Sequence, residues 1–147
     1  LKNMNSDTPQ VRRILGLLAK EIQKSKQQLN GQNIGNALYG LHGMNSDQPE
    51  VREMLQALAY KVVQSSAPLR GIDVGMALYG LRSMDPQLPE VRVLLGTLLH
   101  KVRSQKDMEI ETEALSLAMM GVINSNSWIR DDFMSVLATR AKYVQIR

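Results

Sequence analysis

The sequence predicts an all-α protein: an α-solenoid of tandem helix-turn-helix repeats with a 40-residue period. Three observations lead to this prediction. Residues 1–40 align with residues 41–80 without a gap, and about half of the aligned positions are identical. Each unit contains two segments whose apolar residues recur at helical spacing. Aromatic residues make up only 4% of the chain and cysteine is absent, so the core must be built from aliphatic and methionine side chains.

The repeat continues beyond its second copy. The stretch LHGMNSDQPEVREML at 41–55 returns as LRSMDPQLPEVRVLL at 81–95, and LSLAMMG at 115–121 is a degraded copy shifted by one residue. A fixed period of this length indicates hairpins that stack to share one core. We expect one array over 1–147, with units at about 1–40, 41–80 and 81–121 and a divergent final helix within 122–147. Because Leu1 aligns with Leu41 inside a helical pattern, we also expect neighbouring repeats of a longer parent chain.

The first segment of each unit is predicted to be a helix over 31–44, and again over the corresponding residues of the next unit. Its apolar residues form one stripe: Ile34, Ala37, Leu38, Leu41 and Met44. Glycine recurs inside it, at Gly35 and Gly75 and at Gly40 and Gly80, although each costs about 1 kcal/mol relative to alanine. We expect these glycines to admit a closely packed neighbouring helix, and the alternative is room for a ligand.

The second segment has its own apolar stripe: Val51, Met54, Leu55, Leu58, Ala59 and Val62. Pro49 suits the first turn of a helix, where the N–H has no helical partner. Asp47 and Glu50 have the spacing of a capping box. We expect Gly31 and Gly71 to mark the turn into the next first helix, and 127–147 to be a further second helix without the proline.

No pattern in the sequence indicates catalysis. There are two histidines, no cysteine, and no phosphate-loop, metalloprotease or nucleophile motif. The longest apolar stretch, 115–123, is too short to span a bilayer. We therefore expect a non-enzymatic chain with no cofactor, no metal site, no small-molecule substrate and no membrane span. An intracellular location agrees with the absence of cysteine.

The segment GQNIGNALYGLHGM at 31–44 resembles the first helix of octotricopeptide-type repeats, and tetratricopeptide-like solenoids share parts of the pattern. The resemblance covers about residues 1–121. It implies binding of single-stranded RNA along a concave helical face, and an organellar location. The sequence departs from the family pattern at Gly40 and Gly80, where alanine is common. It also lacks the family's tryptophan-containing start of the second helix.

Candidate ligand-reading residues are those that differ between units on the exposed side of the first helix. They are paired as Asn33 and Asp73, Asn36 and Met76, and His42 and Arg82, beside the repeated Tyr39 and Tyr79. Amide and carboxylate groups can hydrogen-bond base edges, and tyrosine can stack on a base. The alternative is structural: the Asn33 and Asp73 side chains cap their helices, and the tyrosines are half-buried between units.

Possible phosphate contacts are Lys2 and Arg70, together with a repeated row on the second helix: Arg12, Arg52 and Arg92. The row also has a structural interpretation, pairing with acids of the neighbouring unit such as Glu50 or Glu90. Charge does not recur as an RNA groove requires. Residues 1–40 carry six basic and two acidic residues, a net charge of +4, whereas 41–80 carry three and four, a net charge of −1.

The sequence therefore favours a non-enzymatic binding module that binds single-stranded RNA, and a protein–protein interaction scaffold is the alternative. Met76, Met119 and Met120 have the adaptable apolar character of protein-binding surfaces. We expect Met119 and Met120, however, to lie in the core. A contiguous positive groove would favour RNA, and an apolar or acidic groove would favour protein.

Overall fold

The computed structural model describes residues 5–142, apart from the side chain of Ser127, and this part of the chain is all-α as predicted. It contains seven helices: α1 (Pro9–Lys24), α2 (Gly31–Gly40), α3 (Pro49–Gln64), α4 (Gly71–Gly80), α5 (Pro89–Ser104), α6 (Thr112–Val122) and α7 (Ser127–Arg140). Among these described residues, no helix has the length and apolar character needed to cross a membrane.

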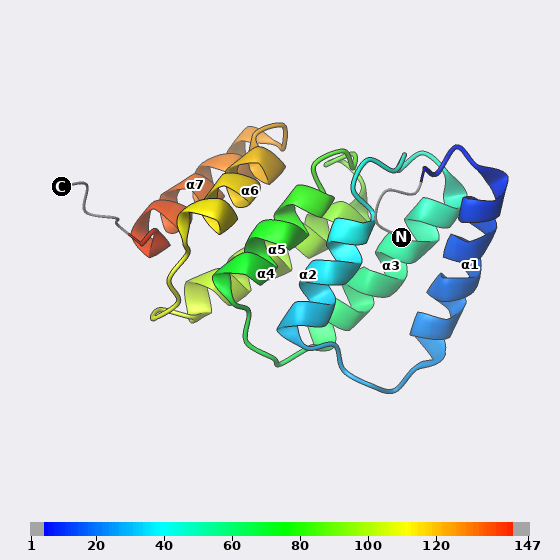
Figure 1. The fold of residues 1–147 in the computed structure, drawn as a ribbon, viewed down its shortest axis with the longest axis horizontal. Helices are drawn as coiled ribbons and strands as arrows, with labels where there is room; N and C mark the ends of the chain where they lie inside the picture. Colours follow the sequence, from blue (N-terminus) through cyan, green and yellow to red (C-terminus); the bar gives the residue numbers. More distant parts are fainter. Residues whose placement is uncertain (1–4, 143–147) are drawn as a thin grey trace.

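The helices form two layers (Figure 1). The short helices α2, α4 and α6 lie side by side in one layer, and α4 contacts both of its neighbours. The longer helices α1, α3, α5 and α7 form the other layer, each in contact with the next. Consecutive helices α2 and α3, α4 and α5, and α6 and α7 join the layers as antiparallel hairpins. Helices that touch most closely are therefore about 40 residues apart in the sequence.

The core lies between the two layers and is largely aliphatic. Apart from the partly buried Ala37, the residues of the two predicted apolar stripes are buried, among them Leu38 and Leu55. Leu78, Leu98 and Phe133 extend the same core into the later units. Removing such side chains from water is the main stabilising contribution to folding, about 1.5–3 kcal/mol for each large aliphatic residue. Because α2 and α3 pack against α4 and α5, and these in turn pack against α6 and α7, neighbouring hairpins share one core.

Glycines set the spacing of the short-helix layer. A Cβ on Gly80 would overlap the carbonyl group of Leu38 on α2, and a Cβ on Gly121 would overlap that of Leu78 on α4. On the other side of α4, a Cβ on Gly75 would lie 2.6 Å from the carbonyl oxygen of Ala114 on α6. The expectation that repeated glycines admit a neighbouring helix is confirmed at these positions.

Two local predictions are wrong. The first helix does not reach residue 44: α2 ends at Gly40, and a turn follows in which Gly43 has a φ of +79°, a conformation that favours glycine. The capping box of Asp47 and Glu50 does not form either. The N-cap of α3 is Gln48, with no side-chain cap, and the Asp47 N–H donates to Asn45 Oδ1 at 2.9 Å. The prediction of proline in the first turn is confirmed at Pro49.

A lysine on each of two long helices joins its unit to the loop of the unit before. Lys61, on α3, is buried and donates through Nζ to the carbonyl oxygens of Ser25 and Gln27. Lys101, on α5, donates to the carbonyl oxygen of Ser65 in the corresponding loop, and burial lowers the pKa of this lysine. The lysines thus pair loop carbonyl groups that lie beyond the ends of α1 and α3, and these contacts hold the loops at 25–30 and 65–70 against the long-helix layer.

Candidate ligand-binding surface

Four of the expected site residues come together where α2 and α4 end. The rings of Tyr39 and Tyr79 stack with centroids 5.8 Å apart, and the His42 ring lies 4.5 Å from that of Tyr79. The Arg82 guanidinium carbon is 5.8 Å from the Tyr79 ring centroid, within the range of a cation–π interaction. We call Tyr39, His42, Tyr79 and Arg82 the aromatic row. It exists because Gly80 lets α4 approach α2 closely enough for side chains one repeat apart to touch.

Both tyrosines are half-buried between neighbouring units, as the structural alternative predicted, whereas His42 and Arg82 are exposed. The aromatic row therefore presents parts of two tyrosines, an imidazole and a guanidinium to solvent. Such a surface suits an aromatic or anionic ligand group. Asn36, on α2, is exposed, and its counterpart Met76, on α4, is half-buried.

Asn33 and Asp73 serve their own helices, which agrees with the structural alternative. Asn33 and Asn30 form a reciprocal capping box, in which each side-chain oxygen accepts from the other residue's backbone N–H, at 3.1 and 2.8 Å. Asp73 is 2% exposed and accepts from the backbone N–H, Nε and Nη2 of Arg70 at 2.9, 3.1 and 2.9 Å. The side-chain hydrogen bond with this carboxylate, followed by its negative charge, raises the pKa of Arg70. Asn30 is a capping residue that was not predicted, although asparagine is among the residues preferred at the N-cap.

The candidate phosphate contacts are largely engaged within the protein. Arg52 pairs with Glu90 of the next unit at 3.3 Å, which confirms the structural interpretation of that arginine. Arg12 donates to the carbonyl oxygens of two residues in the preceding turn, at 3.1 Å each. Arg92 is exposed, and Lys2 lies outside the described residues.

Glu90 is the centre of the contact between α3 and α5. Burial raises its pKa, but hydrogen bonds from Gln56 and from its own backbone N–H, together with Arg52, bring the pKa below the ordinary value. Gln56 Nε2 donates to Glu90 Oε1 at 2.9 Å. Arg52, one member of the repeated arginine row, thus helps to hold one hairpin on the next.

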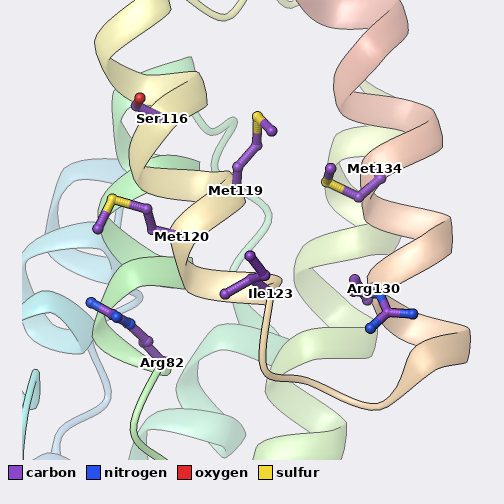
Figure 2. A pocket seen from close by; sticks show the side chains of 7 residues that line it. All are labelled: Arg82, Ser116, Met119, Met120, Ile123, Arg130 and Met134. Atoms are coloured by element: carbon purple, nitrogen blue, oxygen red, sulfur yellow. The ribbon is translucent and has the colours of Figure 1, made fainter.

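A hollow that the sequence did not predict lies between α6 and α7. Its volume is about 360 Å³, and it is lined by Arg82, Ser116, Met119, Met120, Ile123, Arg130 and Met134. Figure 2 shows Met119 and Met134 on the two facing helices, with Ile123 near the end of α6 and Arg82 at the end of α4. The expectation that Met119 and Met120 lie in the core is wrong, because their side chains are 40% and 44% exposed.

The opposite end of the short-helix layer is acidic. Glu109, Glu111 and Glu113, around the start of α6, line a second hollow together with Arg70. The surface of this layer is therefore aromatic at α2 and α4, apolar at the end of α6, and acidic at its start. Within the part of the chain that the structure describes, no group of three or more His, Asp and Glu is placed to hold a metal ion.

Comparison with known proteins identifies no significantly similar protein. The chain matches no family model, and neither a curated protein nor a solved structure is significantly similar to it. Its function must therefore be argued from its own surface.

Proposed function

We propose that the chain is a non-catalytic α-solenoid with a 40-residue period, and that it binds a protein segment along the outer surface of α2, α4 and α6. The solenoid is supported by contacts that recur with the repeat. Gly80 meets Leu38 as Gly121 meets Leu78, and in both cases the same three backbone atoms lie closest. A stack of this kind presents an extended surface to which each unit contributes a few side chains.

A protein ligand is supported by the exposed residues of the short helices, which change from aromatic and charged to apolar along the stack. With the one-residue shift of the third copy, the aromatic row at Tyr79 and Arg82 is followed by Met120 and Ile123 at the end of α6. Methionine and isoleucine exposed together are typical of surfaces that bind proteins. A bound RNA strand would instead need cations in every unit, and Arg52 is paired with a carboxylate.

A second candidate, single-stranded RNA, is favoured by one specific observation. The aromatic row combines two tyrosines, an imidazole and a guanidinium across two consecutive units. Aromatic and guanidinium groups are the platforms on which proteins stack unpaired bases. The resemblance of 31–44 to octotricopeptide-type repeats supports the same candidate.

Two binding measurements on the purified chain separate the candidates. Selection from a displayed library of random peptides should enrich sequences with apolar side chains, and their binding should weaken when Tyr79 or Met120 is replaced by serine. Fluorescence anisotropy with a labelled random single-stranded RNA pool should show little binding at moderate salt. Tight RNA binding that falls steeply with salt, together with no enriched peptide, would overturn the protein proposal in favour of RNA.

A further inference from the structure

The edge formed by α6 and α7 exposes positions that are covered in the other hairpins. Met119 occupies the position of Leu38 and Leu78, which are 0% exposed and whose backbone carbonyl groups lie against a glycine of the next short helix. Arg130 and Met134, on α7, occupy the positions of Arg52 and Gln56, on α3. The Arg52 and Gln56 side chains both donate hydrogen bonds to Glu90 of the next hairpin, at 3.3 and 2.9 Å. The edge of α6 and α7 thus corresponds to the surface on which the other hairpins bind the next pair of helices. Among the described residues, no helix covers it.

The occupant cannot be a short helix stacked as closely as α4 and α6 are. A Cβ on Gly75, on α4, would lie 2.6 Å from the carbonyl oxygen of Ala114 in the next short helix. The equivalent position on α6 is Ser116, which does carry a Cβ. A helix on this edge must therefore lie farther from the α6 backbone, on side chains rather than on glycine. Met119, Ile123 and Met134 supply that layer, and the unbranched methionines adapt to different partners.

The charges at the edge indicate an acidic partner. Among the described residues that line the hollow, two are arginines, Arg82 and Arg130, and none carries a carboxylate. Arg130 Nε lies 3.4 Å from Oδ1 of Asp131, which is 72% exposed, so this pair is a surface contact worth about 0–1 kcal/mol. A partner carboxylate that reaches the half-exposed guanidinium competes with Asp131, as Glu90 reaches Arg52 on α3.

We propose that the edge of α6 and α7 is the docking site for an amphipathic helix of a partner protein, with an acidic residue beside its apolar face. Leucine-like side chains of this helix fill the hollow between Met119, Ile123 and Met134, and its carboxylate pairs with Arg130. The inference rests on the proposed function, because it names the kind of protein segment bound. It places that segment on the edge rather than on the aromatic row.

The test uses two synthetic helices as probes. Both carry leucines at positions i, i+3, i+4 and i+7, and the flanking residues are glutamates in one and lysines in the other. Fluorescence anisotropy measures their dissociation constants for the wild-type chain and for Arg130→Glu, Met119→Ser and Val93→Ser. Val93→Ser is the matched control, because Val93 is 45% exposed on α5 and does not line the hollow. Circular dichroism confirms that each variant stays folded.

We expect the glutamate helix to bind wild type at least about tenfold more tightly than the lysine helix, since loss of one charge-assisted contact changes affinity by about this factor. Arg130→Glu should reverse this preference, Met119→Ser should weaken both helices, and Val93→Ser should change neither. The proposal is overturned if the two helices bind equally, if Arg130→Glu leaves the preference unchanged, or if neither helix binds at up to about 100 μM.

The same measurements separate this proposal from the broader one. If library peptides bind wild type and lose affinity with Tyr79→Ser but not with Met119→Ser or Arg130→Glu, the chain binds protein, but on the aromatic row. In that case the edge proposal fails alone. If no peptide binds and a labelled single-stranded RNA loses affinity with Arg130→Glu, both proposals fail.

Discussion

Replacing Gly80 with alanine tests the glycine-dependent stacking of the short-helix layer most directly. The new Cβ would overlap the backbone carbonyl group of Leu38, which is held in α2 and cannot rotate away as a side chain can. Overpacking costs about 1–3 kcal/mol, and a backbone obstacle places this case near the upper end. Alanine recovers about 1 kcal/mol of helix propensity relative to glycine. We therefore expect Gly80→Ala to lower the free energy of unfolding by about 2 kcal/mol.

Gly96 provides the matched control on the same protein. It lies inside α5, and a Cβ added there would meet no atom within 4 Å. Gly96→Ala should therefore raise the free energy of unfolding by up to about 1 kcal/mol, through helix propensity alone. The two variants should differ by about 3 kcal/mol.

Urea denaturation followed by circular dichroism at the helix band measures both changes, and thermal melts provide a second readout. A destabilisation of about 2 kcal/mol lowers the Tm of a chain of this size by about 4–8 °C. The reasoning is refuted if Gly80→Ala is as stable as wild type, because α2 and α4 then do not approach as closely as described. It is refuted equally if Gly96→Ala destabilises as much as Gly80→Ala.

Three further changes probe contacts within and between units. Folding lowers the pKa of Glu90. The ionised Glu90 side chain therefore stabilises the fold above the ordinary Glu pKa of about 4.3, and this stabilisation is lost as the pH falls through the pKa of Glu90 in the folded protein. Glu90→Gln should therefore destabilise the chain at neutral pH. In urea titrations, the difference in the free energy of unfolding between this variant and wild type should shrink as the pH is lowered. Lys61→Met should speed hydrogen exchange in the loop at 25–30 but not at 65–70, since only the first loop loses its lysine contacts. Asn30→Ala removes the N-cap of α2 and should lower the free energy of unfolding by about 1 kcal/mol, measured by urea denaturation.

Part of the candidate site was predictable because it depends on single helices. The repeated tyrosine and the variable position at His42 and Arg82 stand out in the aligned sequence. That these side chains touch across units depends on the separation of α2 and α4, which glycine spacing indicates but does not specify. The hollow between α6 and α7 was not predicted, because it depends on how helices are covered and not on the pattern within one helix. Met119 lies within an apolar stretch, and only the absence of a covering helix among the described residues leaves it exposed.

The sequence alone determined the two helical segments of each unit and their approximate positions, the proline that begins the second segment and the glycines inside the first. These features depend on residues a few positions apart, so periodicity and capping preferences record them. Only the tertiary structure decided which helix covers which. It showed that Asp73 is buried against Arg70 instead of facing a ligand, that Arg52 binds Glu90, and that Met119 is exposed. The Arg70–Asp73 pair is local, but the burial of Asp73, the pairing of Arg52 and the exposure of Met119 depend on residues about 40 positions away or on the absence of such a neighbour among the described residues. Local residue patterns do not specify these distant contacts.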